Sequence, residues 1–396
     1  MRSPDNPQRH VLFLNWRDTG NPEGGGSEVY VERIAAEFVS RGHHATVLCA
    51  THPGAAAEET TDSGVRMLRR GGRRTVYLWA ALVYLSGWLG LGALVRRPFG
   101  RPDVVIDVCN GLPFLCPIYA RRPVIALVHH VHREQWPVVL GARAARIGWW
   151  IESKLAVRVY RRCRYVTVST ATRDELASLG VDPARITVVH NGTPELAGVS
   201  APRSRYPSVV VLGRLVPHKR VEIALRAVAE LAPEFPAIRL VVAGQGWWEA
   251  RLREVADELG IGERVTFAGF VTDAEKHALL SSAWVALTPS LKEGWGLTIV
   301  EAGAAGTPTV AFRSAGGVSE AIRDGETGLL ADDMDDFVAR VRELLADDQR
   351  RSTMGEAARA YAATFTWTVS GDQFAALVTG FADARLTQAV VPSLAP

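Results

Sequence analysis

The sequence predicts an α/β protein made of two parallel-sheet domains, and three observations support this fold class. Short runs of β-branched residues alternate with helical patterns along the chain, which is typical of βαβ units. The series stops at a segment rich in Pro, Gly and Ser, residues 191–208, and then restarts. At 396 residues the chain also exceeds the size at which one hydrophobic core usually stops growing.

Each half of the chain contains a series of candidate strands separated by helical stretches. In the first half we expect strands at residues 11–16, 44–50, 103–108, 123–130, 165–169 and 186–191. In the second half we expect them at residues 208–214, 238–244, 264–270, 283–290 and 307–312. An amphipathic helix follows Asp333, and a last helical stretch is expected near residues 351–386. These patterns predict domains at residues 1–198 and 199–365, followed by a C-terminal helix and tail at 366–396.

Charge is unevenly distributed between the two halves. Residues 1–198 contain 25 Lys and Arg against 17 Asp and Glu, a net charge of +8, which leaves 20 against 25, or −5, for the rest. A basic half suits a phosphorylated ligand, an anionic membrane or nucleic acid. The arginines occur in dispersed pairs without interleaved aromatic residues, which argues against nucleic acid. The four cysteines lack metal-ligand and disulfide spacing, so we expect reduced core thiols.

A glycine-rich loop between a strand and a helix forms the first candidate site. Gly24, Gly25 and Gly26 precede a helix that begins near Ser27. Glycines let the backbone approach a ligand closely, and the free N–H groups at a helix start attract anions. The loop lacks the spacing of a dinucleotide-binding motif and the lysine of a P-loop. We interpret it as a phosphate or sugar cradle, although three glycines before a helix also fit a flexible turn.

A second strand, loop and helix unit carries two cations. Arg214 and Lys219 lie five positions apart on the loop after the strand at 208–214. A ligand at the carboxyl end of a parallel strand meets this loop first. A guanidinium and a mobile ammonium suit a diphosphate, because they neutralise the charge that builds as a bond to phosphate breaks. Ordinary surface cations on a solvated loop are the alternative.

Two carboxylates border a further loop between a strand and a helix. Glu293 stands at the mouth of this loop, where Gly294 and Gly296 permit close approach of a ligand. Glu301 lies one turn inside the following helix among apolar residues, and a buried carboxylate needs a partner. We expect that partner to be a ligand hydroxyl rather than a protein group, with both carboxylates facing one cleft. A bond from a neighbouring backbone N–H to Glu301 is the alternative.

Several segments taken together resemble a known protein family. The segments "GRLVPHK", "VVAGQG", "VTFAGFV", "TPSLKEGWGLTIVEAGAAGTPTVAF" and "GVSEAIRDGETGLL" closely resemble the retaining glycosyltransferases of family 4. The match is specific in the second half and looser in the first. The resemblance implies the GT-B fold, in which two Rossmann-like domains face each other and a C-terminal helix crosses back to the first. It also implies an enzyme that moves a hexose from a UDP- or GDP-hexose to an acceptor hydroxyl.

The resemblance assigns roles to residues of the second half. Arg214 and Lys219 match the pair that binds the diphosphate of the donor. Glu301 matches the acid that holds the ribose hydroxyls, and Glu293 matches the acid that contacts the donor sugar near its anomeric carbon. The other donor-binding positions that the resemblance implies are Phe270, Val271, Gly294, Trp295, Gly296 and Leu297.

In the first half, the resemblance implies fewer residues. Gly25 and Gly26 match the glycines of a loop near the phosphates and the acceptor. His129 matches the family histidine near the reacting centre, although His130 and His132 follow it closely. A histidine that ends a strand is also often a structural residue.

The resemblance further implies a reaction that needs neither a metal nor a cofactor. Because no residue matches a carboxylate nucleophile, we favour a front-side displacement in which the departing diphosphate takes the proton of the acceptor. The acidic segment 331–336 contains a DxD string, but its position before a helix favours helix capping over metal binding. Alternatives on the same fold are a phosphorylase, a nucleotide-sugar epimerase, and a sugar-nucleotide-binding subunit without catalysis.

Residues 75–95 are uncharged and lie between pairs of arginines. Their length alone is enough to span a bilayer, but glycines interrupt them and a span here would divide the first sheet. We expect a helix buried in the first domain, with docking on a membrane surface as the alternative that would indicate a lipid-linked acceptor. The first apolar run is too short for a signal peptide, so we expect a cytoplasmic protein, or one at the inner face of the membrane. The expected partners are a nucleotide sugar and a carbohydrate, lipid-linked or small-molecule acceptor.

Overall fold

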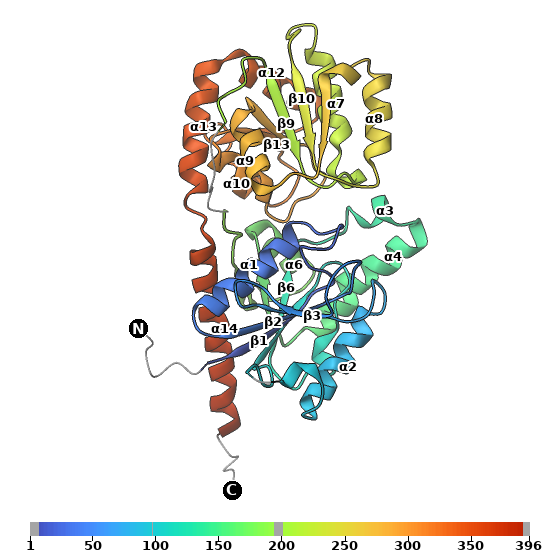
Figure 1. The fold of residues 1–396 in the computed structure, drawn as a ribbon, viewed down its shortest axis with the longest axis vertical. Helices are drawn as coiled ribbons and strands as arrows, with labels where there is room; N and C mark the ends of the chain where they lie inside the picture. Colours follow the sequence, from blue (N-terminus) through green and yellow to red (C-terminus); the bar gives the residue numbers. More distant parts are fainter. Residues whose placement is uncertain (1–7, 97, 194–200, 391–396) are drawn as a thin grey trace.

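The computed structural model describes residues 8–96, 98–193 and 201–390, and it contains two sheets in two domains (Figure 1). The predicted α/β class with two parallel-sheet domains is confirmed. The predicted boundary at residue 198 and the centre of the predicted linker fall on residues 194–200, outside the described residues, as does the tail at 391–396.

Eight strands form the sheet of the N-terminal domain: β1 (His10–Leu14), β2 (His44–Cys49), β3 (Glu58–Thr60), β4 (Arg66–Arg69), β5 (Val104–Val108), β6 (Val124–Val128), β7 (Arg164–Thr167) and β8 (Ile186–Val188). Their order is β3-β4-β2-β1-β5-β6-β7-β8, and all neighbours are parallel except β3 and β4. Every residue of β1, β5 and β6 is buried, as a sheet covered on both faces requires.

Six parallel strands form the sheet of the C-terminal domain: β9 (Ser208–Leu212), β10 (Arg239–Ala243), β11 (Val265–Gly269), β12 (Val285–Thr288), β13 (Thr309–Phe312) and β14 (Gly328–Ala331). Their order is β11-β10-β9-β12-β13-β14. Strands are added on one side of β9 up to β11 and on its other side from β12 onward, so a topological switch point lies between β9 and β12. The N-terminal sheet has the same kind of switch point between β1 and β5. Ligands of such sheets bind beyond the carboxyl ends of the strands at a switch point.

Three strands were absent from the sequence prediction. In β4, Arg66 and Arg69 occupy buried positions where a strand would normally carry apolar residues. Arg66 pairs with Glu58 of β3 at 2.5 Å, and Arg69 pairs with Asp18 at 2.5 Å. These ion pairs satisfy the buried charges, which explains why the polar sequence still forms a strand. The other two missed strands, β3 and β14, have three and four residues, too few for a clear pattern.

Helices cover both faces of each sheet (Figure 1). The N-terminal domain contains α1 (Gly26–Ser40), α2 (Val76–Trp88), α3 (Trp136–Val139), α4 (Ala142–Trp150), α5 (Val157–Val159) and α6 (Thr170–Ser178), with a π-helical turn at Ile151–Ala156. The C-terminal domain contains α7 (Val221–Leu231), α8 (Glu249–Glu258), α9 (Asp273–Ser282), α10 (Leu297–Ala304), α11 (Val318–Ala321), α12 (Met334–Ala346) and α13 (Asp348–Ala362).

The last helix, α14 (Trp367–Val390), leaves the C-terminal domain and runs along the N-terminal domain (Figure 1). Its Asp372 pairs with Arg41 at the end of α1 at 2.7 Å, and its Phe374 stacks on Phe13 of β1 with ring centroids 5.7 Å apart. The predicted crossover helix is therefore confirmed. The two places where the chain passes between domains lie together, because the N–H of Thr193 donates to the carbonyl of Phe365.

The expectation of a buried helix at residues 75–95 is only half correct. One face of α2 packs on the sheet through Val76, Ala80 and Tyr84. The other face leaves Leu78, Trp79, Leu82 and Leu85 exposed, and Leu89 beyond the helix is 73% exposed. Within the described ranges of the chain, no helix is long and apolar enough to cross a membrane.

Two smaller predictions are confirmed. The acidic segment 331–336 caps a helix, because the side chain of Asp333 accepts a hydrogen bond from the N–H of Asp336 at the start of α12. All four cysteines are free thiols, three of them buried and Cys109 partly buried.

Candidate functional site

Arg214 and Lys219 lie after β9, at the switch point of the C-terminal sheet. They line one small pocket with Ser290, which follows β12. The Nζ atom of Lys219 is 2.5 Å from Oε1 of Glu293. Burial alone would raise the pKa of Glu293, but Lys219 and the Ser290 hydroxyl lower it below its ordinary value. The structure thus brings three predicted residues together, with two cations around one ionised carboxylate, an arrangement that attracts a further anion.

The glycine-rich loop of the N-terminal domain lies against this pocket. The guanidinium of Arg214 donates a hydrogen bond to the backbone carbonyl of Glu23 at 3.2 Å. A Cβ atom on Gly25 would lie 3.2 Å from Nε of Arg214, and one on Gly26 would lie 3.9 Å from a methyl group of Leu297. The two loops that the sequence singled out in separate domains are therefore neighbours.

Arg17 is a residue of this region that sequence reasoning missed. It is buried beside Glu28 of α1 at 3.2 Å, and Glu28 in turn accepts a hydrogen bond from the N–H of Gly25. Burial, with a contribution from Arg17, lowers the pKa of Arg214. Arg17 therefore supports the glycine-rich loop and adds positive charge near the pocket.

Glu301 has a protein partner, so the expectation that only a ligand would satisfy it is wrong. The residue is 4% exposed in α10, and its Oε1 lies 2.7 Å from Nζ of Lys276 in α9. Burial raises the pKa of Glu301 above its ordinary value, and the ammonium of Lys276 opposes that shift. Lys276 precedes Glu301 by 25 residues, which is why the local sequence gave no sign of it.

His129 is enclosed at the end of β6. It is 5% exposed, and its ring meets that of Tyr30 edge-on with centroids 5.3 Å apart. Within the described part of the chain, Nε2 of His129 has no hydrogen-bond partner. Burial, with a smaller effect of His132, lowers the pKa of His129 to about 3, so the ring is neutral at physiological pH.

The other two histidines of this segment have side-chain partners. Nε2 of His130 is 3.1 Å from Oε1 of Gln135, and Nδ1 of His132 is 2.9 Å from Oε1 of Glu152. The rings of His130 and His132 lie 4.1 Å apart. Of the three candidates, His132 is therefore the one held by a carboxylate.

The loop of Glu293 touches the N-terminal domain through Gly294. A Cβ atom on Gly294 would lie only 2.3 Å from the carbonyl oxygen of His129 and 3.4 Å from Val168. Real Cβ atoms do not approach other atoms within 3.0 Å. Glycine at this position is therefore what allows the two domains to meet at the end of β6.

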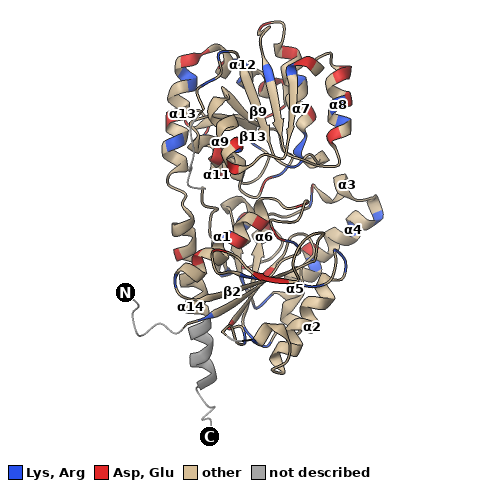
Figure 2. Ribbon diagram, in the orientation of Figure 1, with Lys and Arg blue, Asp and Glu red and all other residues tan. Residues whose placement is uncertain are grey.

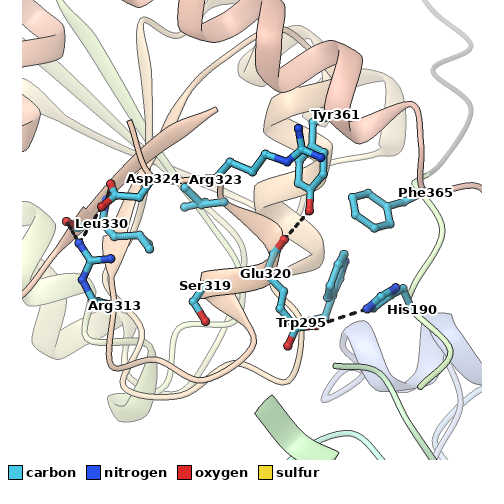
Figure 3. A pocket seen from close by; sticks show the side chains of 11 residues that line it. His190, Trp295, Arg313, Ser319, Glu320, Arg323, Asp324, Leu330, Tyr361 and Phe365 are labelled. Atoms are coloured by element: carbon cyan, nitrogen blue, oxygen red, sulfur yellow. Dashed lines mark hydrogen bonds and ion pairs between the residues drawn. The ribbon is translucent and has the colours of Figure 1, made fainter. Parts of the chain in front are cut away.

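Trp295, the next residue, turns its side chain toward the crossings between the domains. It is 3% exposed, and its ring centroid lies 4.5 Å from that of His190 and 4.9 Å from that of Phe365. These three residues line a cavity of about 340 Å³ beside the crossings (Figure 3). The side chain of Trp295 is in contact with these two rings, and its predicted contact with the donor stays a prediction.

Two further contacts hold the domains together beside this cavity. The carboxylate of Glu320 accepts hydrogen bonds from the N–H groups of Thr170 and Ala171 at 2.9 and 2.8 Å, at the start of α6. Burial alone would raise the pKa of Glu320, but His190 and these N–H groups hold it at about 2. Lys292 forms an ion pair with Glu175 of α6. Sequence reasoning missed both contacts, because their members lie far apart in the chain.

The remaining predicted residues lie at the same edge of the C-terminal sheet. Phe270 and Val271 follow β11, and Phe270 is 73% exposed. Gly296 caps α10 with a φ of 96°, a left-handed conformation that favours glycine, and Leu297 begins that helix.

Comparisons with known proteins agree over nearly the whole chain. Residues 193–361 match the family described as glycosyl transferases group 1, and residues 24–195 match glycosyltransferase family 4. A GDP-mannose-dependent alpha-(1-6)-phosphatidylinositol monomannoside mannosyltransferase of Mycolicibacterium smegmatis is 31% identical over 391 residues, which cover 92% of this chain and 97% of the relative. A D-inositol 3-phosphate glycosyltransferase of Mycobacterium marinum is 38% identical over 207 residues, or 47% of this chain and 43% of the relative.

Solved structures share the arrangement of both domains. Sucrose-phosphate synthase from Thermosynechococcus elongatus superimposes with a TM-score of 0.77 at 19% identity, over 96% of this chain and all of the other. Anabaena HepE in complex with UDP-glucose gives a TM-score of 0.74 at 20% identity, over 94% of this chain and 99% of the other. At these identities the likeness shows the fold.

Proposed function

The chain belongs to the GT-B glycosyltransferases of family 4, and we propose that it moves a hexose from a nucleotide-diphosphate sugar to a hydroxyl group of a lipid-linked acceptor. The observation that carries this proposal is the group formed by Arg214, Lys219 and Glu293, which faces the glycine-rich loop of the other domain. Among donors, GDP-mannose is favoured by the name of the mycobacterial relative that is similar over its full length. The same name favours an acceptor built on mannosylated phosphatidylinositol.

In this proposal, Arg214 and Lys219 bind the diphosphate and neutralise the charge that develops as the bond to the sugar breaks. The acceptor hydroxyl attacks from the side of the departing diphosphate, which takes its proton, so the configuration of the anomeric carbon is retained. Glu293 forms an ion pair with Lys219 in this structure. When the diphosphate takes over Lys219, Glu293 becomes free to accept a hydrogen bond from a hydroxyl of the sugar. The two basic side chains supply the positive charge, so no metal is required.

Ligand binding gives a direct test of the donor class. GDP, UDP and their hexoses should each be added to the protein, and the melting temperature measured with and without EDTA. A ligand that binds only the folded protein raises this temperature. We expect a rise with GDP-mannose that EDTA does not remove, that is absent with guanosine, and that is reduced in Glu301→Ala. A rise that depends on a divalent cation would contradict the metal-independent reaction, and no rise with any nucleotide sugar would contradict the donor class.

A lipid-linked acceptor is supported by the exposed apolar surface of the N-terminal domain. We call this the docking surface and define it by Leu78, Trp79, Leu82, Leu85, Leu89 and Leu91 around α2 and by Val138, Val139, Leu140, Ile147 and Trp150 around α3 and α4. The two helical segments pack on one core cluster, which contains Ala80 and Tyr84 from α2 and contacts Trp149 from α4. They therefore cover the same face of the sheet.

The charges around the docking surface favour an anionic membrane. Arg73 and Arg96 flank α2 and are mostly exposed, and α4 carries Arg143 and Arg146 on its surface. Figure 2 shows that α8 and α13 of the C-terminal domain carry mixed acidic and basic residues, whereas α2 carries none. An apolar face with a basic border is the pattern of a protein that lies on an anionic bilayer.

Vesicle flotation measures this docking. We expect the protein to float with vesicles that contain phosphatidylglycerol and to bind less as salt is raised, because salt screens the arginines. Replacing Trp79 and Leu82 by serine should weaken binding by about tenfold for each side chain, since full burial of a large apolar side chain contributes about 1.5 kcal/mol or more. Trp247→Ser, in the C-terminal domain, serves as the control because Trp247 is a more exposed tryptophan (67% against 44% for Trp79) that lies outside the docking surface. Equal flotation of all variants would contradict the docking surface.

A further inference from the structure

A chain of hydrogen bonds leads from Glu152 to the first turn of α1. Nδ1 of His132 is 2.9 Å from Oε1 of Glu152, and Nε2 of His132 is 3.2 Å from Oδ1 of Asn110. The side-chain amide of Asn110 then lies 3.2 Å from Oγ of Ser27. We call these four residues the polar row.

The row begins at a carboxylate whose position is fixed. Glu152 lies on the π-helical turn, and its side chain is only 11% exposed. It also accepts hydrogen bonds from the backbone N–H of His132 at 3.0 Å and from Nε1 of Trp136 at 2.8 Å. A carboxylate held by three donors orients the imidazole of His132 and keeps the hydrogen on Nδ1.

The position of the hydrogens on His132 determines whether Ser27, at the other end of the polar row, donates or accepts a hydrogen bond. If Nε2 of His132 carries no hydrogen, it faces another acceptor, Oδ1 of Asn110, which is unfavourable. Either His132 carries both hydrogens beside the Glu152 carboxylate, and the amide of Asn110 donates to Ser27, or the amide turns and Asn110 accepts from Ser27. In the first case the hydrogen of the Ser27 hydroxyl is available to a ligand, and in the second case its lone pairs are available. The hydrogens on His132 thus determine which of the two Ser27 offers.

The row lies on the N-terminal side of the domain interface. Ser27 follows Gly26 at the loop after β1, and Asn110 follows β5, so both flank the switch point of the N-terminal sheet. The segment Pro217–Lys219 of the C-terminal domain contacts α3, whose Trp136 donates a hydrogen bond to Glu152. The cations suited to a diphosphate, Arg214 and Lys219, belong to the opposite domain.

We propose that Ser27 and Asn110 form a subsite for a hydroxyl of the acceptor, and that His132 and Glu152 are positioning residues that set their hydrogen-bonding direction. This inference rests on the proposed function and extends it to the acceptor side. The hydroxyl and the amide suit a sugar or cyclitol hydroxyl, because each can donate and accept.

The test compares transfer to an acceptor with hydrolysis of the donor by water. With GDP-mannose as donor and octyl α-mannoside as acceptor, Glu152→Gln should lower the ratio of transfer to hydrolysis by about 10- to 100-fold, since a displacement of about 1 Å has effects of this size. Ser27→Ala should lower the same ratio. Glu134→Gln is the matched control, because Glu134 is an exposed glutamate two residues from His132. If Glu152→Gln behaves like Glu134→Gln, or lowers both rates equally, the inference is wrong.

A second measurement does not depend on any acceptor. Nitrogen NMR of isotope-labelled histidine should show a hydrogen on Nδ1 of His132 in the full-length protein, and this signal should change in Glu152→Gln while the melting temperature confirms a folded variant. An unprotonated Nδ1 in the original protein would overturn the inference. Failure of the proposed function looks different, because the original protein would then neither hydrolyse nor transfer from a nucleotide sugar.

Discussion

Replacing Lys219 by alanine is expected to lower the rate of glycosyl transfer by about 100- to 1,000-fold, the size of effect seen when one group that stabilises developing charge is removed. In the proposed function Lys219 binds the diphosphate of the donor, and its Nζ lies 2.5 Å from Oε1 of Glu293. The substitution removes a positive charge from the site and leaves a carboxylate that is 15% exposed without its ion-pair partner. We therefore expect a lower melting temperature as well as a lower kcat, measured with the same donor.

The two effects of Lys219→Ala can be separated with a second substitution. In Lys219→Ala/Glu293→Gln the unpaired charge is gone, so the melting temperature should recover while transfer stays low. Arg226→Ala, on the exposed face of α7, controls for the loss of a surface cation. Transfer at the original rate in Lys219→Ala would show that the diphosphate is bound elsewhere. Recovery of transfer in the double variant would show that Lys219 acts only by neutralising Glu293.

Much of the site could be predicted because its parts are local in sequence. Arg214 with Lys219, and Glu293 with Gly294, each lie on one loop after a β-branched strand, so a short segment contains both the element and the chemistry. Parallel sheets bring the carboxyl ends of their strands to one edge. This geometry alone predicts that loops far apart in the chain, such as those after β9 and β12, meet.

Contacts between distant segments could not be predicted in this way. Lys276 satisfies Glu301 across 25 residues, and Glu152 holds His132 across 20. The partner of a buried charge is set by how helices pack, which a single sequence does not reveal. The same limit explains why β4 was not predicted. Its buried Arg66 and Arg69 interrupt the run of apolar residues by which a strand is recognised.

The sequence also did not reveal that only one face of α2 is buried. The apolar composition of α2 suggested a helix surrounded by protein, because its sequence contains no charge to mark a solvent-facing side. In the structure only one face packs, and the exposed Leu78 and Leu82 lie on the other. An apolar helix thus indicates burial in a nonpolar environment, and that environment can be the lipid of a membrane as well as a protein core.

Gly294→Ala is expected to lower the rate of transfer by about 100-fold, because a displacement of about 1 Å between reacting groups has an effect of this size. The added Cβ would lie 2.3 Å from the carbonyl oxygen of His129, so one of the two backbones must move. The contact lies between domains, and the simplest relief is a small opening of the interface. Lys219 and Arg214 remain on one domain, so we expect the affinity for GDP to persist while kcat falls.

The control for Gly294→Ala is Gly72→Ala, since a Cβ atom at Gly72 would meet nothing within 4 Å. Calorimetry with GDP and a transfer assay on the same preparations separate binding from turnover. If Gly294→Ala loses GDP binding and kcat together, the loop of Glu293 is itself disturbed and the effect is local to the C-terminal domain. If both stay at the original values, catalysis does not require the two domains to meet at His129. If Gly294→Ala still binds GDP but has a lower kcat, the contact between Gly294 and His129 is needed for catalysis. Only the step that involves both domains is then affected.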